Sequence, residues 1–148
     1  MEKKMFYDDF TVEEKFYLEP VTVTEKEIFE FAGKYDPLPI HTNPGFAKES
    51  IYGGIIASGF HTLCTVHSKM IERKMVFEEV IGGLGIDSLQ WLAPVRPNDT
   101  LSTEVEIVDK IPSSKGGRGI LVYKITARNQ SNQVVMTYQV KSLVKSKE

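Results

Sequence analysis

Cysteine and long apolar runs are what this sequence has least of. Cys64 is the single cysteine among 148 residues, so no disulfide can form within the chain, and such sparing use is typical of a reducing compartment. No run of about 18 apolar residues occurs, and the N-terminus MEKKMFYDDF has no apolar core of the kind found in signal peptides. We therefore expect a cytoplasmic protein without a membrane partner.

An excess of charge of one sign is also missing, as are repeats and linkers. The 18 Lys and Arg residues nearly balance the 20 Asp and Glu residues, for a net charge of -2, so no basic excess indicates a nucleic-acid partner. No Pro/Gly/Ser-rich or low-complexity segment divides the chain. With 41% hydrophobic residues, a single domain over residues 1–148 can bury its own core.

The C-terminal half has the two-residue period of β-strands. In residues 99–111 the odd positions from 101 to 107 are Leu, Thr, Val and Ile, whereas the even positions are Ser and Glu. Such alternation predicts one buried and one solvated face. Turn-forming residues separate four strand-length segments, at 83–95, 99–111, 119–129 and 133–144. We expect an antiparallel sheet covered on one side.

A strand and a capped helix are expected before this sheet. Residues 16–23 are of strand type, with Pro20 making the strand an edge or irregular. Thr24 followed three residues later by Glu27 forms a capping box, and an apolar stripe follows until Gly33 ends the helix. The helix therefore directly precedes the loop at residues 35–41.

A second, longer helix is predicted in the middle of the chain. Asn43 followed by Pro44 is typical of an N-cap and first helical residue of a short turn. The longer helix is expected from Gly54 to about Lys74, and apolar or small residues lie on almost every side of its first turns, which predicts a buried helix. The expected fold class is α+β, with the antiparallel sheet wrapped around this central helix.

The stretch YDPLPIH, residues 35–41, places a carboxyl group and an imidazole on a stiffened loop. Asp36 and Leu38 both precede proline, which disfavours helical backbone at each. Fully extended, the loop would carry the side chains of Asp36 and His41 roughly ten ångströms or more apart. One bend at a proline would instead bring both toward a common water, as acid–base catalysis requires. In the alternative without catalysis, the aspartate bonds nearby amides and the histidine is internally satisfied.

Two adjacent glycines mark the expected start of the central helix, in YGGIIASG at residues 52–59. Gly53 and Gly54 would let a ligand approach the backbone closely. The free N–H groups of a helix start favour an oxygen with partial negative charge, so an oxyanion site is one interpretation. The other is a tight entry turn, with Gly59 admitting a neighbouring strand.

The central helix holds other polar candidates. Ser58 and His61 are three residues apart and would share a face, and Cys64 and His67 lie further along. No spacing typical of a zinc site is present, so neither a metal nor a cofactor is predicted. The segment SSKGGRG, residues 113–119, lacks the phosphate-loop pattern and is interpreted as a hairpin turn.

Taken in order, these motifs resemble the MaoC-like dehydratases, the (R)-specific enoyl-CoA hydratases of the hotdog fold. The resemblance covers roughly residues 10–144, and its most specific parts are the blocks YDPLPIHTNP and WLAPVRPNDTL. It implies a five-stranded antiparallel sheet around a central helix and a homodimer. It also implies an acyl thioester of coenzyme A or acyl carrier protein as substrate, with water added across a trans-2-enoyl double bond.

The resemblance also implies roles for particular residues. Asp36 and His41 match the D-x-x-P-x-H block and would hold the reacting water, while an amide at Gly53 or Gly54 would bind the thioester oxygen. The position usually held by Asn or Gln is Leu38 here, so that side chain's polar contact is absent. A serine that orients the histidine in some members falls at or near His61, which leaves three possible partners in the sequence: Ser58, His61 and Thr62.

Two other functions fit the same resemblance. The hotdog fold also hosts acyl-CoA thioesterases, because fold does not dictate function. A non-catalytic subunit that binds acyl thioesters would retain the tunnel without turnover, and Leu38 is compatible with that alternative. The sequence leaves open the acyl chain length, its branching and the direction of the reaction.

Overall fold

The computed structural model describes residues 4–147, and only the backbone of Met75. Its centre is a six-stranded antiparallel sheet in the order β1-β4-β5-β6-β3, with β2 paired beside β4. The five strands on that path match the five-stranded sheet expected from the resemblance. The strands are β1 (Lys15–Tyr17), β2 (Val21–Thr22), β3 (Val80–Trp91), β4 (Thr100–Pro112), β5 (Arg118–Arg128) and β6 (Val134–Lys145).

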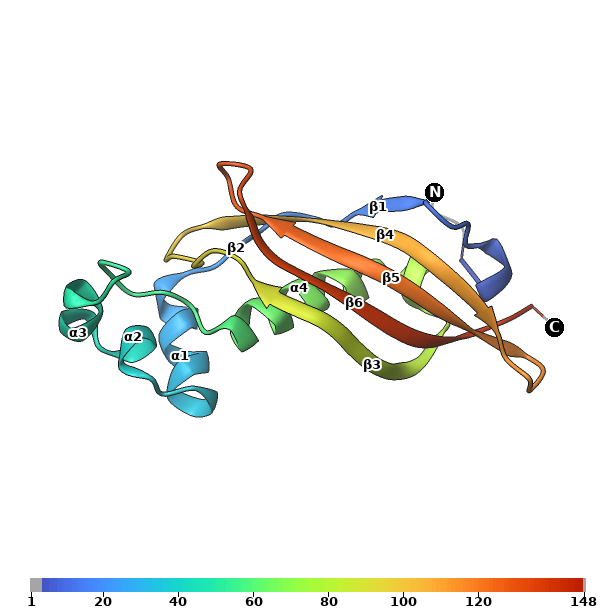
Figure 1. Cartoon of the computed structure of the whole chain (residues 1–148), viewed down its shortest axis with the longest axis horizontal. Coiled ribbons are helices and arrows are strands. Elements are labelled where there is room, and N and C mark those ends of the chain that lie inside the picture. The colour runs from blue at the N-terminus through green and yellow to red at the C-terminus, as the bar shows by residue number, and fades with distance from the viewer. Residues whose placement is uncertain (1–3, 148) are drawn as a thin grey trace.

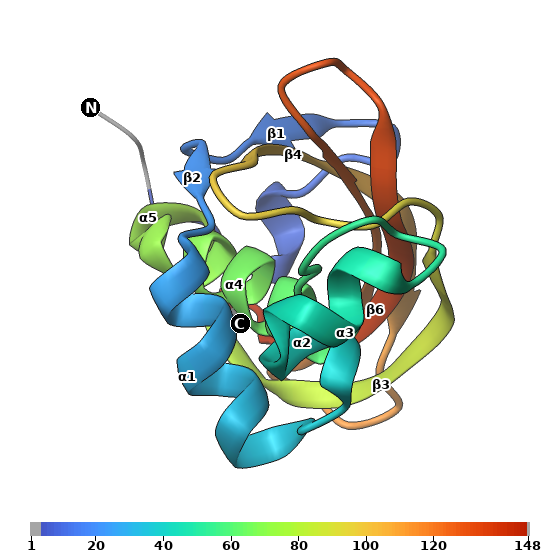
Figure 2. The same cartoon turned by 90° about the vertical axis from the view of Figure 1, so that its left-hand side faces the viewer.

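The helices gather at one end of the sheet and beneath it (Figure 1). In the part of the chain described, no helix is long and apolar enough to cross a membrane. A 3-10 turn, η1 (Tyr7–Asp9), precedes the five α-helices: α1 (Glu25–Tyr35), α2 (Pro39–Thr42), α3 (Pro44–Glu49), α4 (Gly59–Glu72) and α5 (Lys74–Phe77). Figure 2 shows α1, α2 and α3 clustered around the end of the molecule where α4 begins.

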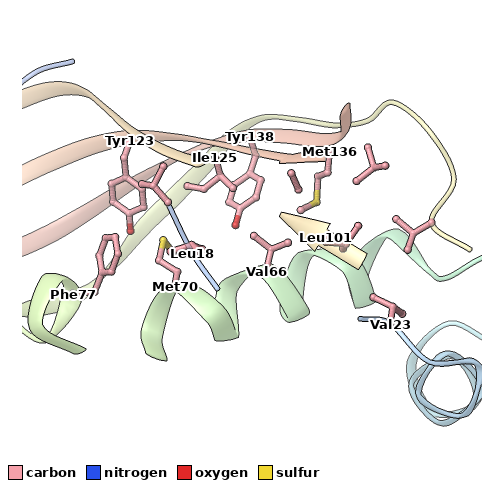
Figure 3. Packing of buried hydrophobic residues seen from close by; sticks show 14 of the residues in the cluster. Leu18, Val23, Val66, Met70, Phe77, Leu101, Tyr123, Ile125, Met136 and Tyr138 are labelled. Carbon is pink, nitrogen blue, oxygen red and sulfur yellow. The ribbon is translucent and has the colours of Figure 1, made fainter. Parts of the chain in front are cut away.

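The curved sheet packs on α4, which confirms the expected fold class (Figures 1 and 2). The alternation predicted in β4 is present, since Leu101, Val105 and Ile107 are fully buried while Ser102 is exposed. Opposite this face, α4 contributes buried apolar side chains such as Val66, which Figure 3 shows beneath the strands. The apolar side of each element thus faces the layer between helix and sheet, where burial stabilises the fold.

Local signals at the helix starts are confirmed. Thr24 accepts a hydrogen bond from the Glu27 N–H at 3.2 Å, and the Glu27 side chain accepts from the Thr24 N–H, as a capping box does. The Asn43 side chain caps α3 by accepting from the Phe46 N–H at 3.1 Å, with Pro44 as the first helical residue.

Several boundaries differ from the sequence-based expectation. The central helix begins at Gly59, five residues after Gly54, because Ser58 and not the glycine pair caps it. The first helix continues to Tyr35 in place of ending at Gly33. The strand expected at 16–23 is divided into β1 and β2, and β3 lies at Val80–Trp91 where 83–95 was expected.

The prediction that α4 is buried on almost every side is wrong for the single chain. Only part of its surface is covered, and Phe60 and Ile71 are 55% and 47% exposed. Cys64 and His67 are exposed as well. The sheet covers one side of α4, and apolar residues on its other side remain accessible.

Candidate active site

Asp36 directly follows the last residue of α1, and Pro37 after it explains why the helix ends there. Its N–H still donates to the Ala32 carbonyl at 2.9 Å. Pro37 disfavours helical backbone at the preceding residue, and Asp36 takes φ -154° and ψ 68°. The chain therefore leaves the helix here, with the Asp36 side chain 21% exposed.

His41 lies in the single helical turn α2, which begins at Pro39. Its ring is buried, and Nδ1 lies 2.7 Å from the carbonyl oxygen of Ile56. Because a carbonyl oxygen only accepts hydrogen bonds, Nδ1 must carry a proton, and in the neutral form of the ring the lone pair is then on Nε2. That Nε2 faces Oδ2 of Asp36 at 3.5 Å.

Ser58 connects the carboxylate to the central helix. Its hydroxyl donates to Oδ2 of Asp36 at 2.7 Å and accepts from the Phe60 N–H at 3.2 Å. Ser58 is thus the N-cap of α4, preceding the helix where the sequence-based expectation placed it within the helix. One hydroxyl fixes the orientation of the Asp36 carboxylate relative to the start of α4.

The distance between Asp36 and His41 decides between the two loop conformations considered from the sequence. The extended alternative is wrong, because the α2 turn folds the chain back and leaves 3.5 Å between the two side chains. This separation exceeds the roughly 2.7–3.2 Å of a direct N–H···O hydrogen bond. Since the carboxylate and the Nε2 lone pair both accept hydrogen bonds, one water beside the pair could donate a hydrogen to each.

Gly53 and Gly54 lie in a turn before the helix, so the prediction that they begin it is wrong. Gly53 has φ 69°, which glycine adopts readily, and its N–H donates to the Ser50 carbonyl at 3.1 Å. Both glycines line a separate pocket with Lys48 and Arg96. The tight-turn interpretation describes this pair better than the oxyanion interpretation does.

Gly59 holds the position that the glycine pair was expected to hold. It is the first residue of α4, and first-turn N–H groups have no partner within their helix and lie at the positive end of its dipole. Trp91 packs closely here, since its Nε1 donates to the Gly59 carbonyl at 3.0 Å and a Cβ on Gly59 would overlap its ring. The sequence does carry a signal for this start, because Ser58 before an apolar periodic segment is an N-cap pattern.

A groove of about 290 Å³ adjoins Gly59. It lies between the start of α4 and the ends of the neighbouring strands, and its walls include Tyr52, Thr62, Trp91 and Val135. Concave surfaces lined by apolar groups with a few polar ones are typical of small-molecule sites. The groove thus adjoins the first turn of α4, and Ser58, which caps that turn, bonds Asp36; Asp36 and His41 are not among the residues that line the groove.

His61 lies apart from this pair. Its buried ring stacks on Phe31 of α1, with centroids 4.9 Å apart and planes 9° from parallel. Burial lowers the pKa of His61, while the nearby Glu27 carboxylate acts in the opposite direction. The contacts described for His61 fasten α1 to α4 and include none with Asp36 or His41.

The remaining candidates are also accounted for. Thr62 lines the groove, whereas Cys64 and His67 face a different cavity further along α4. Leu38 is 53% exposed. Within residues 4–147, no three side chains of His, Cys, Asp or Glu are grouped so as to hold a metal ion.

Comparison with known proteins gives one family and several similar chains. Residues 9–129 match the profile of the MaoC like domain. The uncharacterized protein YdeM of Bacillus subtilis (strain 168) is 32% identical over 141 residues, which are 95% of this chain and 99% of that protein.

Two solved structures are similar in fold and at 28–29% identity. The monoamine oxidase regulatory protein from Archaeoglobus fulgius has a TM-score of 0.91 at 29% identity, with 99% of this chain and 97% of that chain covered. The MaoC-like dehydratase from Rhodospirillum rubrum has a TM-score of 0.85 at 28% identity, with 97% and 99% covered.

Proposed function

Because this chain belongs to the family of MaoC-like domains, we propose that it is a hydratase or dehydratase acting on an acyl thioester. The reaction adds water reversibly across the double bond of a trans-2-enoyl thioester and gives an (R)-3-hydroxyacyl thioester. The acyl group is carried by coenzyme A or by an acyl carrier protein. The reaction needs no cofactor, because water supplies every atom that is added.

The observation that carries the proposal is the pairing of Asp36 with His41. Their side chains lie 3.5 Å apart, and each is fixed by another hydrogen bond, from Ser58 to the carboxylate and from His41 to the Ile56 carbonyl. Two fixed and adjacent acceptors hold the oxygen of one water in place, with a lone pair free. Such positioning of an attacking group is a large part of enzymatic rate enhancement.

In the hydration direction, the water oxygen bonds to the β-carbon of the enoyl group. One member of the Asp36–His41 pair takes a proton from the water, and the π electrons of the double bond move toward the thioester oxygen. That proton then passes from the Asp36–His41 pair to the α-carbon, and the carbonyl re-forms. General acid–base catalysis of this kind contributes about 10²- to 10⁴-fold in rate.

The negative charge that develops on the thioester oxygen needs a hydrogen-bond donor. We place this oxygen in the groove against the N–H of Gly59, at the start of α4. The charge exists only during the reaction, so this amide stabilises the transition state more than the substrate. The proposal thereby replaces Gly53 and Gly54 with Gly59 as the donor.

Similar proteins support the reaction type. The relative from Rhodospirillum rubrum, 28% identical, is described as a MaoC-like dehydratase. The (R)-hydratase from A. caviae involved in PHA biosynthesis has the same fold, with a TM-score of 0.72, but only 23% identity. At that identity the likeness concerns the fold alone, and the (R) configuration of the product is part of the proposal.

The test is to incubate the purified protein with crotonyl-CoA and follow the loss of the conjugated absorbance. We expect 3-hydroxybutyryl-CoA as product, in the (R) configuration by chiral chromatography, with no release of free thiol. Free thiol from saturated acyl-CoA would identify a thioesterase instead. Binding of acyl-CoA without any turnover of enoyl thioesters would identify a non-catalytic binding subunit.

We further propose that the protein is a homodimer formed along β3. This strand is at one edge of the sheet, and it exposes Ile81, Leu84 and Ile86, at 55%, 55% and 48%. An exposed apolar edge strand is prone to pair with another chain. A second copy of this protein has the same edge and can satisfy it symmetrically.

Sedimentation should therefore give twice the chain mass of 16.7 kDa. Leu84→Glu places a charge on the edge and should shift the protein to the monomer. Val12→Glu is the control, because Val12 is 45% exposed but lies outside β3. A wild-type monomer, or a Leu84→Glu protein that stays dimeric, contradicts the proposal.

A further inference from the structure

The Ser58 hydroxyl makes two hydrogen bonds, and one of them does not belong to the helix that it caps. Ser58 is 0% exposed. Its Oγ accepts from the Phe60 N–H at 3.2 Å, as an N-cap does, and donates to Oδ2 of Asp36 at 2.7 Å. A serine hydroxyl carries one hydrogen, so that hydrogen is committed to Asp36. The second bond therefore joins the start of α4 to the end of α1.

The Asp36 carboxylate depends on this bond for its direction. Within residues 4–147, the Ser58 hydroxyl is the one group that hydrogen-bonds the carboxylate, and Nε2 of His41 lies beyond the usual hydrogen-bond range at 3.5 Å. Pro37 restricts the backbone of Asp36 but leaves rotation of the side chain open. Since the Asp36 side chain is partly exposed, its carboxylate has room to turn toward solvent unless a donor holds it.

His41 is held by the same segment of the chain in a different way. Its Nδ1 bonds the main-chain carbonyl of Ile56 at 2.7 Å, just before Ser58 in the sequence. A main-chain carbonyl is present whatever residue stands at position 56, whereas the bond to Asp36 needs a hydroxyl at position 58. The side chain at position 58 thus decides whether the carboxylate stays beside the imidazole.

Ser58 can act on the reaction only through Asp36. A nucleophilic serine needs a base that takes its proton and an open approach for the reacting carbon. Ser58 is fully buried, and the described residues that line the groove do not include it. Its hydroxyl therefore sets the direction of the carboxylate and does not attack the thioester.

The N-cap of α1 has the same pattern of bonds without contact to the Asp36–His41 pair. Thr24 accepts from the Glu27 N–H at 3.2 Å, and its hydroxyl donates to the Glu27 carboxylate at 2.8 Å. This carboxylate belongs to the first turn of the same helix, so both bonds serve the helix start. The carboxylate that Ser58 bonds lies 22 residues away, beyond the end of another helix. Comparison of the two caps therefore separates capping from positioning.

We infer that Ser58 is a positioning residue for the hydration reaction, which holds the Asp36 carboxylate beside Nε2 of His41 through its hydrogen bond. The inference rests on the proposed function for the reaction itself. It goes beyond that function by making turnover depend on a hydroxyl that neither contacts the substrate nor transfers a proton. Without this hydroxyl the carboxylate keeps its chemistry but loses its direction, and a small misplacement of a reacting group lowers the rate steeply.

The test measures hydration of crotonyl-CoA by Ser58→Ala and Ser58→Gly. Both variants lose the donor and add no bulk at a buried position, but glycine retains most of the stability of an N-cap whereas alanine does not. We expect kcat to fall about 10- to 100-fold in both, the effect of losing one hydrogen bond to a carboxylate. The Kd of butyryl-CoA, a saturated thioester without a double bond to hydrate, should stay at the wild-type value by isothermal titration calorimetry.

Thr24→Ala is the matched control, because it also removes a cap hydroxyl that donates to a carboxylate. It should lower the melting temperature, as Ser58→Ala does, but retain the wild-type kcat. A loss of kcat in Thr24→Ala as large as that in Ser58→Ala would assign the effect to capping and overturn the inference.

The double variant of Ser58→Ala and Asp36→Asn distinguishes positioning from a purely structural role. If Ser58 acts through Asp36, its loss should lower kcat no further once Asp36 has been replaced. Losses that multiply would show that Ser58 acts elsewhere, such as on the first turn of α4, and would overturn the inference. Wild-type kcat in folded Ser58→Ala and Ser58→Gly proteins would do the same and leave the proposed function intact. A wild type without hydration activity would refute the proposed function, and the inference with it.

Discussion

Replacing Asp36 with asparagine should lower kcat for hydration of crotonyl-CoA by about 10²- to 10⁴-fold, the usual contribution of a positioned acid or base. Asparagine keeps an oxygen that can accept the Ser58 hydroxyl, so the local structure is retained. The side chain, however, can no longer take up a proton. The rate is measured from the loss of conjugated absorbance, and circular dichroism checks the fold.

His41→Gln should have an effect of similar size, for the same reason. The double variant should lose much less than the product of the two single losses, because the two groups act on one water as a unit. Asp109→Asn is the control, since Asp109 is an exposed carboxylate on β4, and it should retain wild-type turnover. Full turnover in folded Asp36→Asn and His41→Gln proteins would remove both residues from the mechanism.

The second large effect is expected at Gly59. In Gly59→Ala the new Cβ would overlap the Trp91 ring, so either the ring or the first turn of α4 must move. Misplacing a donor to the thioester oxygen should lower kcat by about 10²- to 10³-fold. Overpacking should also lower the free energy of unfolding, by about 1–3 kcal/mol. Turnover and thermal unfolding are measured on the same samples, at a temperature where the variant is folded.

Gly54→Ala tests whether the donor to the thioester oxygen is Gly59 or the Gly53–Gly54 pair. A Cβ at Gly54 meets nothing within 4 Å, and the residue is not among those with positive φ, so the variant should fold normally and remain active. If Gly54→Ala loses activity while folded Gly59→Ala keeps it, the oxyanion amide belongs to the glycine pair and not to α4.

Signals that depend on a few neighbouring residues predict the local structure correctly. The capping box at Thr24 and the Asn43 cap form as expected because both partners are three residues apart. The alternation in β4 likewise predicted the buried face, since neighbouring side chains of a strand point in opposite directions. These features need no knowledge of the rest of the chain.

Errors arose where distant segments meet. The predicted start of α4 at Gly54 is wrong because Ser58, which also bonds Asp36 from 22 residues away, caps a helix that begins at Gly59. His61 is one of three possible partners of His41 in the sequence, but its stacking partner is Phe31 on another helix. The apolar residues of α4 were assigned to the core, although one side of the helix is left uncovered by the sheet.

By itself, the sequence determined that an acid and an imidazole lie on a proline-stiffened segment, next to a helix on which an antiparallel sheet packs. Only the tertiary structure decided that they face each other. The Ile56 carbonyl, 15 residues from His41, sets the tautomer of the His41 ring. The Ser58 hydroxyl, 22 residues from Asp36, sets the orientation of the Asp36 carboxylate. Proline restricts the backbone of its own neighbourhood, but the direction of a side chain is set by contacts that form only when the whole chain has folded.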